Sequence, residues 1–347
     1  MAGAKSGAIA LQDLLDDFNI YDQYVDVVCA FEWLFTQVTE IADTVRHFER
    51  FPRIKVTVED GSEVTLTPDF TVVFKDGTGL VGEISKLAMH DNSIDKACRQ
   101  IGKYAELTQL PIDEAGTLVE VSDLDVLQLV PSDVGLAAVQ RIIKDRYLNA
   151  DHDYNPRKAP VIAQFSRSAD RDEYRYTLQH LPDPANGVLP EADDPSTIGH
   201  FLTRVNNVTA DRFNHIKARR KFMNDPIKPL YLATHLWTAH WPTEYGGAGA
   251  EPIEVTPADI AQTLRDQFGT GRASEVKAAL ALLARAGLAA DNRDGTWTVS
   301  RATLRLQGER DIHRIIAIKA AKNAKPVVRA RATRTARADQ TQQGMLF

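Results

Sequence analysis

The chain has 347 residues, which is long enough for two domains with well-buried cores. Its composition, 44% hydrophobic and 25% charged residues, is typical of a globular protein. No apolar run is long enough to span a membrane, so we expect a cytoplasmic protein with no membrane partner. The formal net charge of -6 argues against a uniformly nucleic-acid-binding surface, although the chain becomes strongly basic after residue 300.

The first elements are predicted from periodicity. Apolar residues recur at helical spacing from about Leu11 to Phe48, which predicts a long helix or a helix pair. The residues 53–58 then alternate, and a turn and two further runs, 63–74 and 80–85, predict a meander of three strands.

Two acidic residues lie on the last two strands of this meander. Asp76-Gly77 between two apolar runs predicts a tight hairpin turn, which brings Asp69 and Glu83 nearly opposite one another. Strand alternation places Glu83 on the same face as Val81 and Ser85. Two adjacent carboxylates repel unless a cation lies between them, and oxygen ligands favour Mg²⁺ or Mn²⁺.

A Gln/Tyr pair, Gln100 and Tyr104, follows one turn apart on the next predicted helix. Together with Pro68-Asp69, Glu83 and Lys86, this pattern resembles the PD-(D/E)XK nuclease superfamily in its RecB-like branch, over about residues 20–135. The resemblance implies a DNA nuclease in which Asp69, Glu83 and the carbonyl of Ile84 hold Mg²⁺ or Mn²⁺. It also implies that Gln100 and Tyr104 hold the DNA backbone or the catalytic strand, and it makes Glu40 a candidate additional acid.

The lysine of the family pattern is displaced here. Ser85 occupies its usual position, and Lys86 should point away from Glu83 unless a bulge turns it inward. Lys96 and Lys103 are alternatives, because they can share a helix face with the Gln/Tyr pair. The competing hypothesis is an inactive site, in which the fold serves as a DNA-binding adaptor or regulator.

The rest of the first domain, 1–181, is predicted to complete an α/β fold with a mixed central sheet flanked by helices. A strand ends at Pro131, a helix covers 135–148, and the runs 160–168 and 173–181 form a hairpin. The segment 182–228 is predicted to be a linker followed by a helix over 197–224, whose basic end is a candidate phosphate contact through Arg219, Arg220 and Lys221.

Residues 229–305 show two helices joined by a turn and then a hairpin. Thr256 and Ser274 are predicted to cap the two helices, and Asp294-Gly295 is predicted to form the turn of the hairpin. The pattern resembles a winged helix, a class that binds either DNA or proteins. For DNA, the expected contacts are Lys277, Arg285, Arg293 and Arg301.

The segment 306–347 is basic and is predicted to be a helix followed by a disordered tail. Its last residues resemble the peptides that dock onto the bacterial replication sliding clamp, with Gln343, Met345, Leu346 and Phe347 as the contacts. These features together predict a nucleoid-associated nuclease acting in DNA repair, mobile-element maintenance or defence against phage.

Overall fold

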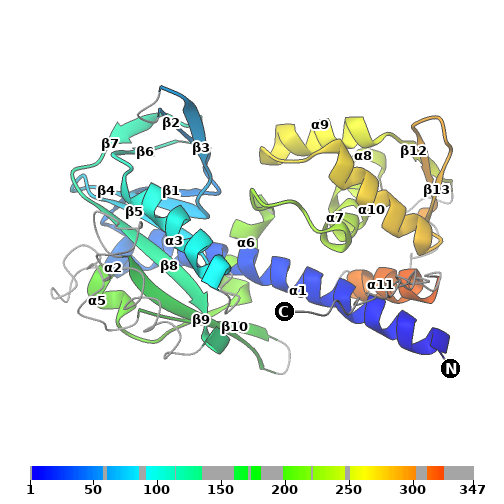
Figure 1. Cartoon of the computed structure of the whole chain (residues 1–347), viewed down its shortest axis with the longest axis horizontal. Coiled ribbons are helices and arrows are strands. Elements are labelled where there is room, and N and C mark those ends of the chain that lie inside the picture. Colours follow the sequence, from blue (N-terminus) through cyan, green and yellow to red (C-terminus); the bar gives the residue numbers. More distant parts are fainter. Residues whose placement is uncertain are drawn as a thin grey trace, which may run out of the picture.

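The computed structural model describes most of the chain (Figure 1). The described residues are 2–57, 61–85, 91–113, 115–134, 160–170, 173–180, 198–219, 222–246, 251–301 and 311–323. The predicted helix 135–148, the linker 182–194 and the tail after 323 lie outside them. No helix in the described part is both long and apolar enough to cross a membrane.

The chain begins with the long helix α1, Ala2–Gln37, followed by one short turn of helix, α2, Thr39–Ala42. The prediction of helix as far as Phe48 was wrong, because β1 occupies Val45–Arg50. The apolar residues Val45 and Phe48 fit a helical spacing, but the backbone there pairs with a distant strand, from Val45 opposite Phe74 to Arg50 opposite Phe70. Tertiary pairing thus overrides the local pattern.

A mixed seven-stranded sheet forms the centre of the first part, in the order β1-β4-β5-β8-β9-β10-β11. Strands β5, β8 and β9 are parallel neighbours, and the other neighbours are antiparallel. The added strands are β4 (Phe70–Phe74), β5 (Gly79–Ile84), β8 (Leu124–Pro131), β9 (Val161–Asp170), β10 (Glu173–His180) and β11 (Asn206–Thr209). This mixed α/β architecture is the one predicted.

The predicted three-stranded meander is instead two hairpins in different sheets. β2, Ile54–Thr57, pairs only with β3, Glu63–Leu66, and the main sheet resumes at Phe70. Pro68 lies between the two hairpins, and it has no amide hydrogen to donate to a neighbouring strand. A further hairpin, β6 (Gln109–Pro111) and β7 (Leu118–Glu120), was not predicted.

The two faces of the central sheet are covered by different helices. Phe70, Leu80 and Leu127 belong to the core that includes α1, whereas Val81 and Val126 belong to the core beneath α3, Asp91–Ala105. The Phe70 ring packs directly over Gly82, where an added Cβ would lie 2.1 Å from the ring. Glu83 therefore points to the α3 side of the sheet, as the alternation of the strand predicts.

The sheet continues beyond residue 181, where the first domain was predicted to end. The predicted helix 197–224 is divided into α5 (Ile198–Leu202), strand β11 and α6 (Ala210–Arg219). β11 pairs with β10 through Tyr176 opposite Val208. The segment predicted to be a connector therefore supplies the last strand of the sheet, and α6 packs on α1.

The second part is mostly helical and lies at the other end of α1 (Figure 1). Its elements are α7 (Pro229–His235), a π-helical turn (Leu236–His240), α8 (Trp241–Tyr245), β12 (Ile253–Val255), α9 (Pro257–Phe268), α10 (Ala273–Arg285), β13 (Ala289–Asp291), β14 (Trp297–Val299) and α11 (Ile312–Lys322). The three strands form a sheet in the order β12-β14-β13.

The helices of this part are capped as the sequence predicts, with one exception. The Thr256 hydroxyl accepts a hydrogen bond from the Asp259 amide, and Gly269 ends α9 with a φ of 68°. Ser274 does not cap α10, because the helix begins at Ala273 and Arg272 is its N-cap. The Glu275 carboxylate accepts from the Arg272 amide at 3.0 Å and so satisfies the N-terminus.

Candidate functional site

The two acidic residues singled out by the sequence lie side by side at the end of the β4–β5 hairpin. Phe70 pairs with Gly82, and the same register carried one residue further places Asp69 opposite Glu83. The Asp69 amide donates to the Gly82 carbonyl at 3.0 Å. The side chain of Asp69 then accepts a hydrogen bond from the Ile84 amide, with 2.7 Å between N and Oδ2. This bond fixes one carboxylate against the backbone of the neighbouring strand.

Helix α3 brings its Gln/Tyr pair to the second carboxylate. Gln100 Nε2 donates to Glu83 Oε1 at 2.7 Å and also lies 2.9 Å from the Tyr104 hydroxyl. Tyr104 is buried, and its hydroxyl interacts with the Glu83 carboxylate as well. Four polar side chains from two strands and one helix thus converge, as the sequence pattern predicted.

The second oxygen of Glu83 has no hydrogen-bond partner among the described residues. Oε2 is also shielded from solvent. Burial raises the pKa of Glu83 well above its usual value, and the negative charge of Asp69 raises it further, while the Tyr104 hydrogen bond opposes this shift. The ionised pair is therefore unfavourable unless a proton or a cation compensates it.

The ligand set suits a hard divalent cation. Asp69 and Glu83 offer carboxylate oxygens, and the Ile84 carbonyl is the adjacent backbone oxygen. Among the residues that the structure describes, no group of three His, Cys, Asp or Glu side chains could hold a metal. Two carboxylates with water in the remaining positions is, however, a usual environment for Mg²⁺ in proteins. Glu83 Oε2 is the atom that such a cation would satisfy.

The three lysines predicted to serve the site have different positions. Lys86 lies outside the described residues. Lys96 and Lys103 are exposed on α3, whereas Tyr104 is buried, so the helix face that these residues were predicted to share is divided between solvent and core. Glu40, the candidate additional acid, is exposed on α2.

The position expected for lysine is instead filled by a buried hydrogen bond. Ser85 Oγ accepts from Gln128 Nε2 at 2.8 Å, and both residues are buried. Gln128 lies on β8 directly beside Glu83 in the parallel register. Gln128 was not predicted, although one glutamine inside the apolar run LDVLQLV was a usable signal.

Further negative charge surrounds the site. Burial raises the pKa of Tyr24 to about 12, and Asp133, Asp69 and Asp225 each contribute to this increase. Asp225 also raises the pKa of Glu83. These residues come from α1, from the end of β8 and from the segment before α7, so no local sequence pattern connects them.

The residues predicted to bind DNA have different environments. Lys277, Arg285 and Arg293 are exposed on α10 and the β13–β14 turn. Arg301 is buried, and its guanidinium donates to the carbonyls of Trp241 and Gly246 at 3.1 and 2.9 Å. It holds the end of α8, and its burial sets it apart from the other three residues predicted to contact DNA.

The other predicted contacts are only partly described. The Arg219 side chain is 64% exposed and forms an ion pair with Glu32 at 2.8 Å. Arg220 and Lys221 lie outside the described residues, as do the terminal residues Gln343, Met345, Leu346 and Phe347.

Comparison of the chain with protein-family models, with curated proteins and with solved structures gave no match. The chemistry of the acid pair therefore has to follow from its own geometry and charge.

Proposed function

We propose that the chain is a metal-dependent nuclease that hydrolyses phosphodiester bonds in DNA at the Asp69/Glu83 pair. The observation that carries this proposal is Glu83 Oε2, which has no hydrogen-bond partner among the described residues and belongs to a half-buried side chain beside a second carboxylate. A purely structural glutamate would be expected to have both oxygens satisfied, because burying an unpaired carboxylate is costly.

Each polar residue has a distinct part in this proposal. Asp69 and Glu83, with the Ile84 carbonyl, would hold Mg²⁺ or Mn²⁺. When bound, the cation supplies positive charge next to the phosphate and the attacking water. The Ile84 amide orients Asp69, and Gln100 and Tyr104 orient Glu83, so that both carboxylates are set before the substrate arrives.

The test is DNA cleavage with purified full-length chain in Mg²⁺, Mn²⁺ and EDTA. The variants are Asp69→Asn and Glu83→Gln, with Glu63→Gln on exposed β3 as the matched control. We expect metal-dependent cleavage that both site variants abolish and the control retains. Mn²⁺ binding measured by calorimetry should fall in the same two variants. Cleavage that persists in Asp69→Asn and Glu83→Gln would rule out this site.

The alternative function is a DNA-binding adaptor or regulator without catalysis. The Ser85–Gln128 hydrogen bond favours it, because a neutral pair fills the position where the nuclease pattern has a cation. This alternative predicts DNA binding without cleavage under any metal. It also predicts that Glu83→Gln leaves DNA affinity unchanged.

We propose two further roles outside the sheet. The succession α7–α8, β12, α9, α10 and the β13–β14 hairpin supports a winged-helix assignment, with Lys277, Arg285 and Arg293 available to DNA. The terminal peptide would bring the enzyme to the sliding clamp, in repair, mobile-element maintenance or phage defence at the nucleoid. Deleting residues 343–347 should abolish binding to purified clamp in calorimetry, and unchanged binding would remove that role.

A further inference from the structure

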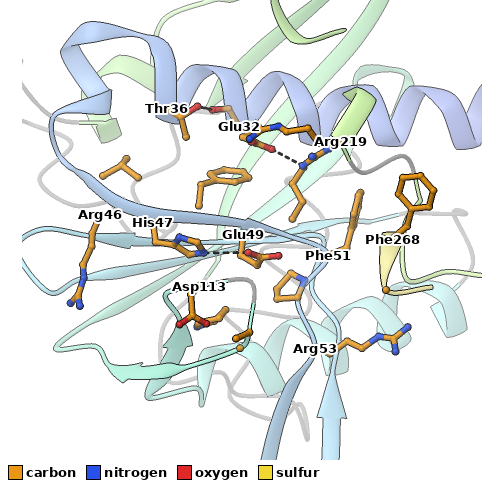
Figure 2. Close-up of a pocket in the computed structure, with 18 of the residues that line it drawn as sticks. Glu32, Thr36, Arg46, His47, Glu49, Phe51, Arg53, Asp113, Arg219 and Phe268 are labelled. Carbon is orange, nitrogen blue, oxygen red and sulfur yellow. Dashed lines mark hydrogen bonds and ion pairs between the residues drawn. The ribbon is translucent and has the colours of Figure 1, made fainter. Parts of the chain in front are cut away.

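A groove of about 960 Å³ follows the edge strand β1 (Figure 2). The continuous run 45–53 lines one wall, and the end of α1 lies above it. The β6–β7 turn and the C-terminal end of α9 provide the other walls. The groove therefore lies where the central sheet meets the helical second part of the chain.

Arginines outnumber acids among the residues that line this groove, by five to four. Of the charged residues that line it, those exposed are Asp266 and four arginines from three segments, Arg46 and Arg53 from the run 45–53, Arg219 from α6 and Arg265 from α9. The remaining acids are partnered or only partly accessible. Glu32 is buried and paired with Arg50 and Arg219, and Glu49 pairs with His47 at 3.2 Å (Figure 2). Arginines spaced along a groove are the usual arrangement for contacting successive phosphates.

The groove is adjacent to the acid pair. The amide of Phe51, which lines the groove, donates to the Asp69 carbonyl at 2.8 Å. Phe51 itself is buried, so a polymer in the groove would contact the exposed Arg53 two residues further along, next to the backbone that is hydrogen-bonded to Asp69. Phe268, at the end of α9, adds a half-buried aromatic ring to the opposite side (Figure 2). An aromatic side chain in a basic groove is a platform on which a base can stack.

We propose that this groove binds a single strand of DNA and leads it to the Asp69/Glu83 pair. At about 960 Å³ its size is that of a ligand pocket, roughly 300–1,000 Å³. It can therefore enclose a few nucleotides of one strand, whereas a duplex would lie outside it. The destination of the strand rests on the proposed nuclease function. The binding does not, because it depends only on the arginines and the groove.

The experiment measures binding of a short fluorescent oligodeoxynucleotide by anisotropy in EDTA, where no metal-dependent cleavage occurs. The test variant of the full-length chain is Arg46→Gln/Arg53→Gln. The matched control is Arg314→Gln, exposed on α11, and the competing surface is tested by Lys277→Gln/Arg285→Gln. The melting temperature of each variant is compared to exclude unfolding.

We expect the groove variant to bind single-stranded DNA about tenfold more weakly, and the slope of log K against log salt to fall by about 1.4 for two lost phosphate contacts. The control should bind as the wild type does, and a blunt duplex of the same sequence should compete poorly. Affinity of the groove variant within about twofold of wild type, or preference for the duplex, would overturn the proposal.

The two proposals, DNA binding in the groove and DNA cleavage at the acid pair, can fail independently. Loss of binding in the groove variant with no cleavage by any protein supports the groove and rejects the nuclease. Cleavage that requires Asp69, with unchanged binding by the groove variant, supports the nuclease and rejects the groove.

Discussion

Glu83→Gln should stabilise the metal-free protein while removing the proposed metal site. In the wild type, Oε2 of Glu83 is buried beside Asp69 and no described residue donates a hydrogen bond to it. An amide at this position keeps an oxygen that can accept from Gln100 and gains an NH₂ group that can donate to Asp69. Removing one unsatisfied buried polar group is worth about 1–3 kcal/mol. At roughly 2–4 °C per kcal/mol, the melting temperature should rise by a few degrees.

The stability gained by Glu83→Gln should increase with pH. The folded pKa of Glu83 is raised above its unfolded value of 4.5. Below pH 4.5 the carboxyl is protonated in both states, so the wild type loses nothing there. As the pH rises through the raised pKa of the folded state, the folded protein must either keep a proton on Glu83 or bury its negative charge. Either requirement lowers the stability of the wild type. Glutamine does not titrate, so the advantage of the variant should appear only above pH 4.5 and then grow.

The assay is thermal unfolding of wild type, Glu83→Gln and the exposed control Glu63→Gln in EDTA, at acidic and mildly alkaline pH. Added Mg²⁺ or Mn²⁺ should then stabilise the wild type and the control but not Glu83→Gln. If Glu83→Gln is no more stable than the wild type in alkaline EDTA, or if its advantage is the same at both pH values, the inference of an uncompensated carboxylate is refuted.

Three further substitutions test the structure around the site. Gly82→Ala should reduce stability by about 1–3 kcal/mol, because the new Cβ would overlap the ring of Phe70; denaturant unfolding measures this. Arg301→Met should cost about 1–3 kcal/mol by leaving the buried carbonyls that end α8 without donors, and it should leave DNA affinity unchanged. Lys217→Met should cost about 3–5 kcal/mol, because it leaves the buried Asp26 carboxylate without its cation, and the loss should shrink in acid.

Controls for these substitutions come from exposed positions. Arg293→Met and Lys277→Met remove charges that have no buried partner, so each should change stability by less than about 0.5 kcal/mol. An Arg301→Met variant that unfolds like Arg293→Met would contradict the structural role of Arg301. The same comparison between Lys217→Met and Lys277→Met tests the buried ion pair.

Local signals predicted the features that are built from neighbours in the chain. The Asp76-Gly77 turn sets the hairpin register, and the register sets Asp69 opposite Glu83. Gln100 and Tyr104 follow from helix periodicity. These predictions needed only the residue preferences of β-turns and the side-chain periods of helices and strands.

The features that the sequence did not predict depend on distant partners. Residues 45–50 have a pattern compatible with helix, and only pairing with β4 decides for strand. β11 likewise forms because it pairs with β10, from which it is separated by many residues in the sequence. Gln128 reaches the site because β8 is the parallel neighbour of β5, which no local pattern specifies. Arg301 resembled a surface cation because its three carbonyl partners lie more than fifty residues away.

Helix α1 has a consequence for any ligand that reaches both parts of the chain. Phe18 stacks on His313 of α11, with ring centroids 4.4 Å apart, and Phe31 packs on Phe70 of the sheet at 5.4 Å. Both rings project from one uninterrupted helix, which separates them by about 20 Å along its axis. The spacing between the acid pair and the C-terminal helices is therefore set by a rigid rod. If the proposed nuclease function holds, a polymer bound at both ends would be presented at a constant offset, which would give a preferred distance between the bound position and the site of cleavage.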